Sequence, residues 1–262
     1  MINSALYREP QLLDSVLHRH KKLQKLSDFS ITQGMHAVYL TATEFPQAAL
    51  EFPIIFVNTG ERSEAGKPVV APVVMLGLAA NENLRLNGAR WDAGYVPAFI
   101  RRFPFLTAAV KGADAPAVFI DAAWSGVSDT EGEPLFDAEG QPTGTLKNMI
   151  AFLERFDAEQ RRTRAMCSRL VELDLLKDMQ ADAAMPNGVN LKVEGFLAID
   201  EDKLGALSDE ATLELHRSGI MMLLHAHLLS LPNIKQLVER KAVRVMAKAG
   251  PSGPTPTPPP KA

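Results

Sequence analysis

The sequence predicts an α+β protein with a β-rich first half and a mainly helical second half packed against it. Short apolar runs rich in β-branched residues, separated by Pro and Gly, fill residues 30–125 and are typical of strands. Apolar residues at helical spacing dominate residues 145–248. An acidic, Gly/Pro-rich loop at 125–145 separates the halves. We expect a single domain over residues 1–248 and a disordered, proline-rich tail over 249–262.

Four apolar segments of the first half predict strands, at residues 37–40, 54–57, 69–78 and 118–120. Their length and their β-branched residues favour strands over helices. The polar stretch 58–67 joins the second segment to the third, so we expect these two strands to pair as a hairpin.

Two further signals belong to the first half. Residues 43–51 predict a short helix, with Pro46 near its first turn, where proline is tolerated. Asn87-Gly88 lies between extended segments and predicts a tight turn.

The second half begins with a long helix, predicted from about residue 145 to residue 174. Leu146, Ile150 and Leu153 begin an apolar face that recurs at helical spacing. Charged residues such as Arg161 occupy the opposite face.

Beyond this helix, Asn187-Gly188 predicts a turn, and residues 191–199 predict a strand pair or one bent strand. Ser208 is placed to cap a helix, with acidic residues in the first turn. Gly219 can end that helix, and a second helix follows it.

Composition excludes several classes of protein. The formal net charge of −3 gives no basic footprint for nucleic acid. The lone Cys167 allows no internal disulfide and suits a reducing compartment. Apolar runs at 69–80 and 219–231 are shorter than the roughly 20 residues of a membrane span. Without a recognisable secretion signal, we expect a cytoplasmic protein, with signal-less export to the cell surface as the alternative.

The most chemically loaded segment supplies the candidate site. Two aromatic rings, one carboxylate and three guanidinium groups within 13 residues could bind an anionic or planar ligand, or a protein. The residues are Arg90, Trp91, Asp92, Tyr95, Arg101 and Arg102. In the alternative interpretation, Arg102 bonds a core carboxylate while Trp91 and Tyr95 pack in the core. We expect Arg102 to be structural, and Arg90 and Trp91 to be functional.

No metal site or cofactor is predicted. His225 and His227 diverge by about 200° if they share a helix. The acidic residues after Asp129 resemble a calcium loop, but its sixth and twelfth positions hold Pro134 and Gly140.

Six segments together resemble the bacterial SapC family. They are VYLTATEFPQAALEFPIIFV at 38–57, VVMLGLAANENL at 73–84, RWDAGYVPAFIRRFPF at 90–105, DTEGEPLFDAEGQPT at 129–143, VEGFLAIDEDKLGALSDEATLELHRSG at 193–219 and AHLLSLPNIKQL at 226–237. Their order and spacing make the resemblance specific. The family is named for a protein linked to a paracrystalline surface layer, which implies association with the cell envelope or surface layer and supplies no catalytic residues.

Three functions remain open at this point. The first is a non-catalytic accessory or binding protein with the segment 90–102 as its recognition edge. The second is an enzyme acting on an anionic small molecule. Its acid–base and anion-binding groups would be Asp92, Arg101, Arg102, Asp121, Glu131 and Glu133. The third is a regulatory nucleic-acid-binding protein that uses the basic face of the helix at 145–174.

Overall fold

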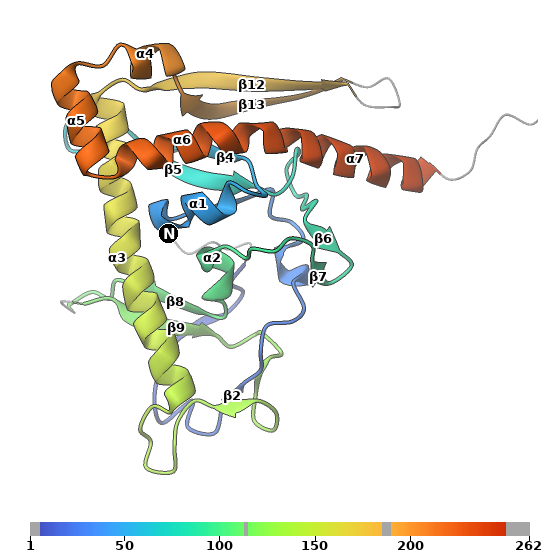
Figure 1. Cartoon of the computed structure of the whole chain (residues 1–262). Helices are drawn as coiled ribbons and strands as arrows, with labels where there is room; N and C mark the ends of the chain where they lie inside the picture. Colours follow the sequence, from blue (N-terminus) through green and yellow to red (C-terminus); the bar gives the residue numbers. More distant parts are fainter. Residues whose placement is uncertain (1–5, 113–114, 185–189, 250–262) are drawn as a thin grey trace, which may run out of the picture.

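The computed structural model describes residues 6–112, 115–184 and 190–249, so the Asn187-Gly188 turn and the tail from residue 250 lie outside it. The sheet with the most strands among the described residues is five-stranded and antiparallel, has the order β12-β13-β4-β5-β3, and lies in the upper part of Figure 1. The predicted hairpin is confirmed as β4 (Ile54–Arg62) and β5 (Pro68–Met75). β3 (Ala37–Tyr39), also predicted, pairs with β5.

The second half of the chain supplies the other edge of this sheet. β13 (Asn190–Ile199) was expected from its sequence, whereas its partner β12 (Leu176–Ala184) was not. β13 joins β4 where Leu197 lies opposite Phe56. The two halves therefore share one sheet, and the second half contributes a hairpin in addition to its helices.

The long helix α3 (Gly144–Glu172) confirms the prediction for residues 145–174. Thr143 caps it by accepting a hydrogen bond from the backbone N–H of Leu146. Leu153 and Leu170 lie on its buried face, and the helix packs against β5 (Figure 1). This packing sets α3 beside the β4–β5 hairpin.

Helices follow β13 in the C-terminal part. They are α4 (Glu201–Gly205), α5 (Asp209–Arg217), α6 (Ile220–Ser230), the 3₁₀ turn η3 (Leu231–Asn233) and α7 (Ile234–Ala249). Both α6 and α7 pack against the sheet. Ser208 caps α5 as predicted, and Gly219 has a φ of +77°, the left-handed conformation that glycine accepts. None of the helices in the described ranges has the length and hydropathy needed to cross a membrane.

Smaller elements make up the rest of the described chain. Residues 43–51 form the 3₁₀ turn η2 (Ala42–Glu44) followed by α1 (Phe45–Ala48), with Pro46 in the first turn as predicted. The remaining elements are β1 (Pro10–Leu12), β2 (Lys22–Leu23), η1 (Ser30–Thr32), β6 (Leu86–Asn87), β7 (Arg90–Trp91), α2 (Ala98–Arg101), β8 (Phe105–Ala108), β9 (Ala117–Asp121), β10 (Val127–Ser128) and β11 (Glu133–Pro134). The predicted turn at Asn87-Gly88 joins β6 to β7, and the strand predicted at 118–120 lies within β9.

Alternation along β4 divides the core between the two faces of the sheet. Ile54 and Phe56 belong to the main core, which also includes side chains of α1, α3 and α6. Ile55 points to the other face and belongs to a second cluster with Phe196 of β13 and Leu237 of α7. Both faces of the hairpin are thus anchored near β13, and its far end extends toward α3.

Candidate functional site

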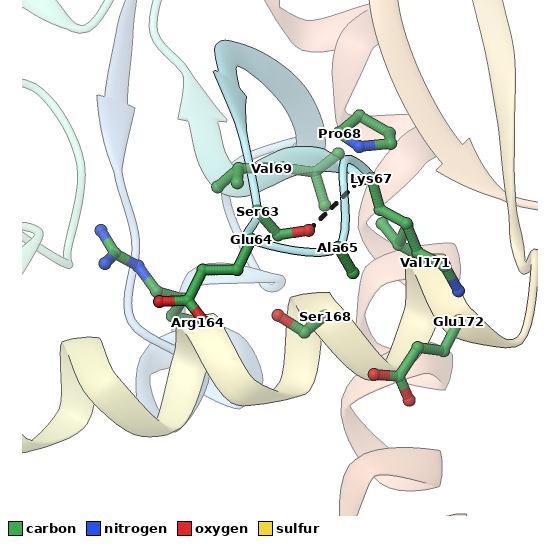
Figure 2. Close-up of a pocket in the computed structure, with 11 residues that line it drawn as sticks. Ser63, Glu64, Ala65, Lys67, Pro68, Val69, Arg164, Ser168, Val171 and Glu172 are labelled. Carbon is green, nitrogen blue, oxygen red and sulfur yellow. Dashed lines mark hydrogen bonds between the residues drawn. The ribbon is translucent and has the colours of Figure 1, made fainter.

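A cleft of about 560 Å³ lies between the end of the β4–β5 hairpin and α3 (Figure 2). Its volume falls within the range of pockets that hold small molecules. The hairpin contributes Ser63, Glu64, Ala65, Lys67, Pro68, Val69 and Val70, and α3 contributes Arg164, Ser168, Val171 and Glu172. Apolar side chains, two hydroxyl groups and charges of both signs therefore meet in one concave site.

The hairpin wall is held by hydrogen bonds within its own turn. The N–H of Ser63 donates to the carbonyl of Lys67 over 2.9 Å, and the N–H of Lys67 donates to Ser63 Oγ over 3.2 Å. Gly66 adopts a φ of +74°, which favours glycine, and its carbonyl accepts a hydrogen bond from Arg62. These hydrogen bonds hold the turn in one conformation, although residues 58–68 are exposed.

The helical wall presents one face of α3 to the cleft. Arg164, Ser168, Val171 and Glu172 are separated by four, seven and eight positions from the first, a spacing that keeps them on one side of a helix. At a rise of 1.5 Å per residue, Arg164 and Glu172 lie about 12 Å apart along the axis. Thr163 fixes the neighbouring turn of the helix, because its Oγ1 accepts the N–H of Ala42 over 2.8 Å.

Most of the charged groups in the cleft are uncompensated. Among the described residues, Glu64, Lys67 and Arg164 form no ion pair and no side-chain hydrogen bond. Glu172 accepts from Arg169, over 3.1 Å, on its own helix. The free groups of the cleft are therefore one carboxylate, one ammonium and one guanidinium.

The predicted segment 90–102 lies elsewhere, beside α7 and α1, and its aromatic residues are used within the fold. Trp91 is only 7% exposed, and its Nε1–H donates to the carbonyl of Tyr95 over 2.8 Å. Its ring packs against Phe29 and Phe52. The structure thus places Trp91 in the core, because the chain supplies apolar neighbours on both sides of the indole.

The charged residues of this segment are divided between core and surface. Arg90 is exposed, whereas Asp92 accepts from Arg240 of α7 over 2.6 Å, a hydrogen bond that holds the pKa of Asp92 below its usual value. Arg101 is exposed, donates to the carbonyl of Val96 over 2.9 Å, and lies over the rings of Tyr95 and Phe152.

Arg102, unlike its neighbour Arg101, is buried, at 6% exposure. No ion pair among the described residues includes it, so the expected bond to a core carboxylate is absent from that part of the chain. Its guanidinium lies instead over aromatic rings, 4.3 Å from the centroid of Phe99 and 4.9 Å from that of Phe156. This packing accords with the structural role expected of Arg102.

Two glutamates that the sequence analysis did not single out organise this segment. Glu44 accepts from Tyr95 Oη over 2.6 Å and from the N–H of Ala98 over 2.7 Å. Glu51 accepts from the N–H groups of Gly94 and Tyr95. Burial, followed by the hydrogen bond to Glu44, raises the pKa of Tyr95. The capping-box pattern at Thr41 and Glu44 is the local signal that could have identified the first of these carboxylates.

Arginines of α7 bind the chain on the other side of the segment. Arg244 donates to the carbonyl of Asn83 over 2.7 Å and also to that of Leu86. Arg85 is 2% exposed and lies over the ring of Phe52, and burial lowers its pKa to about 10. The hydrogen bonds of Arg244 join α7 to the β6–β7 region, whereas Arg85 packs against Phe52.

The candidate acid–base groups do not converge. Asp121 is buried and accepts the N–H groups of Arg8 and Glu9, which fixes the N-terminal strand to β9. Glu131 of the acidic loop accepts a hydrogen bond from the side chain of Gln24, and Glu133 is exposed on β11. None of the six residues considered for catalysis lines the cleft.

The histidines and the cysteine are also dispersed. Within the described ranges, no group of three or more His, Cys, Asp or Glu side chains is arranged to hold a metal ion. His227 is fully buried, while His225 is exposed on the same helix. Cys167 is buried, and burial raises the pKa of its thiol to about 12, which makes it a poor nucleophile.

The chain was compared with known protein families, curated proteins and solved structures. The model of the SapC family matches residues 13–237. The chain therefore belongs to the SapC family. Searches of the curated proteins and of the solved structures found no match.

Proposed function

We propose that this SapC-family chain is a non-catalytic accessory or binding protein that takes its ligand in the cleft between the β4–β5 hairpin and α3. The observation that carries the proposal is the set of three uncompensated charged groups, Glu64, Lys67 and Arg164, around a concave site. Charged side chains in a cleft without partners are available to a ligand, and each hydrogen bond to a charged group contributes about 1.5–3 kcal/mol.

The dispersion of the acid–base candidates favours binding over catalysis. A catalytic site needs its groups within reach of one reacting atom. Asp92 is paired with Arg240, Asp121 holds backbone N–H groups, and Arg102 is stacked in the core. The cleft itself has two serine hydroxyl groups, Ser63 and Ser168, with no histidine among its lining residues.

The cellular setting belongs to the same proposal. Cys167, a buried free thiol, suits a reducing compartment, so we place the protein in the cytoplasm. The alternative, association with the cell envelope or surface layer, is supported only by the resemblance to the family. Fractionation of the native host, followed by detection of the chain in each fraction, separates these alternatives.

The binding function is tested by filling the cleft. Ser168→Trp places an indole between the two walls, whereas Ala165→Trp adds the same bulk at an exposed position of α3 that does not line the cleft. Native mass spectrometry of the full chain purified from its own host should detect a bound species with wild type and Ala165→Trp, and lose it with Ser168→Trp. Retention of every bound species by a folded Ser168→Trp protein contradicts the proposal.

A further inference from the structure

The outer side of α6 lacks the charged residues that an exposed helix usually carries. Residues 218–234, which include all of α6, contain no Asp, Glu, Lys or Arg. Met222 and Leu229 of this helix are nevertheless 60% and 77% exposed. The exposed side of α3, by contrast, carries charged residues such as Arg161 and Arg162. A helix that is apolar on all sides is typical of a buried one, so the outer side of α6 has the composition of a covered surface.

The exposed positions continue onto α7 with the spacing that two paired helices require. The elements α6, η3 and α7 follow one direction across the molecule (Figure 1). Exposed residues recur along them at positions 222, 225, 229, 232, 236, 239, 243 and 246, a line that we call the outer stripe. Its alternating intervals of three and four are the heptad spacing of a helix that contacts another helix along its length. At 1.5 Å per residue the outer stripe is about 36 Å long.

The apolar side chains of the outer stripe lie at its two ends. Met222 and Leu229 form the end on α6. Val243 and Met246, which are 66% and 58% exposed, form the end on α7. Met222 and Met246 are equally far from position 234, and polar side chains such as that of Glu239 lie between the ends. A surface with two matching ends is self-complementary under a two-fold axis, because residue i of one copy then contacts residue j of the other, and j contacts i.

We infer that two copies of this chain pair through the outer stripe, with their α6–α7 helices antiparallel. Met222 of each copy lies opposite Met246 of the other, and Leu229 lies opposite Glu239. Association removes the exposed apolar side chains of both copies from water, which favours the dimer. The inference is independent of the proposed binding function, because no residue of α6 or α7 lines the cleft.

Charge favours the antiparallel arrangement over the parallel one. Parallel helices in register place Glu239 opposite Glu239 of the second copy, and like charges in contact oppose association. Antiparallel helices separate these two carboxylates by about 15 Å along the axis. They also bring each Glu239 within about one helical turn of His225 of the second copy, whose imidazole can donate a hydrogen bond to a carboxylate.

The mass of the full chain in solution is the first test. Sedimentation equilibrium at tens of micromolar protein should give twice the mass of one chain, with a dissociation constant obtained from the concentration dependence. A protein that sediments as a single chain over this range overturns the inference and leaves the outer stripe to a different partner.

Two leucines of similar exposure supply a matched pair of variants. Leu229 is 77% exposed on the outer stripe, and Leu17 is 74% exposed in the turn between β1 and β2. Leu229→Glu should raise the dissociation constant of the dimer at least about a hundredfold, because each copy loses an apolar contact and places a carboxylate opposite Glu239. Leu17→Glu should associate as wild type does. Equal dissociation constants for wild type and Leu229→Glu overturn the inference.

A charge exchange tests the antiparallel alignment. Combining Leu229→Glu with Glu239→Lys places opposite charges at two positions that face each other only between antiparallel copies. Within one chain these positions are about 15 Å apart along the helix, too far for an ion pair. The double variant should therefore bind itself at least about tenfold more tightly than Leu229→Glu does. If the double variant associates as weakly as Leu229→Glu, while circular dichroism shows that both are folded, the antiparallel alignment is overturned.

Discussion

Arg240 of α7 donates to Asp92 Oδ2 across 2.6 Å, and this ion pair links the C-terminal helix to the chain that follows β7. The two residues are 148 positions apart in the sequence. The side chains of Arg240 and Asp92 are 32% and 41% exposed. Solvent screening therefore limits the stabilisation, in spite of the short distance.

A double-mutant cycle with Asp92→Ala and Arg240→Ala should give a coupling energy of about 1 kcal/mol in urea unfolding, near the upper end for partly exposed pairs. The pair of Lys203 and Asp174, at 44% and 81% exposure, is a suitable control and should give a smaller coupling energy, because solvent screens it more. If the two pairs gave equal coupling energies, the ion pair between Asp92 and Arg240 would stabilise the fold no more than an exposed surface pair does.

Elements with local signals were predicted well. The β4–β5 hairpin follows from two apolar runs around a polar turn, and α3 follows from 3.6-residue periodicity. β12 was missed because LKDMQADAA contains no β-branched residue, and it is extended only because it pairs with β13.

The environment of the segment 90–102 depends on distant partners, and the sequence could not supply them. Glu51 lies 43 positions before Gly94, whose N–H it binds. The cleft depends in the same way on contact between the turn after β4 and α3, about one hundred residues later. Predicting either feature required the tertiary packing of α3 and α7, which no local pattern encodes.

The burial of Arg102 gives a prediction that separates packing from charge. Arg102→Ala should destabilise the protein by about 2–4 kcal/mol, because it leaves a cavity among Tyr7, Phe99 and Phe156. Arg102→Met keeps much of the volume and removes a buried charge that lacks an ion pair in the described chain, so it should cost less than about 1.5 kcal/mol. Urea unfolding measures both, and Arg90→Ala at an exposed site should change stability by less than about 0.5 kcal/mol.

A loss for Arg102→Met as large as that for Arg102→Ala would contradict this account, because both variants lack the guanidinium and only methionine keeps the volume. It would mean that the guanidinium contributes through hydrogen bonds rather than through contact with the aromatic rings. The prediction for Arg102→Met is therefore the sharper of the two.

Glu44→Gln tests the carboxylate that joins η2 to Tyr95. Both oxygens of Glu44 accept two hydrogen bonds, one of them from a backbone N–H: that of Ala98 at Oε1 and that of Thr41 at Oε2. In either orientation of a glutamine amide, its NH₂ group meets a backbone N–H. We expect a loss of about 2 kcal/mol or more in the free energy of unfolding, measured with urea. Glu139→Gln on the surface is the control and should leave it unchanged.

His227 gives the protein a defined dependence of stability on pH. The ring is fully buried against Phe56, and its Nε2 accepts the N–H of Ile199 over 3.1 Å. Burial lowers the pKa of His227 from 6.5 to about 4. The unfolded chain therefore binds a proton at higher pH than the folded protein does, and the stability associated with a neutral imidazole is complete above pH 6.5.

As the pH falls from 6.5 to about 4, protonation of the unfolded state removes that stability, by about 3 kcal/mol at 1.36 kcal/mol per pKa unit. His227→Gln keeps an acceptor for the N–H of Ile199 but does not titrate, so its stability should fall by about 3 kcal/mol less than that of wild type across this range. His225→Gln removes the exposed histidine of the same helix and should follow the wild-type profile. Urea unfolding at closely spaced pH values supplies the profiles, and a wild-type slope that persists in His227→Gln would assign the acid sensitivity to other groups.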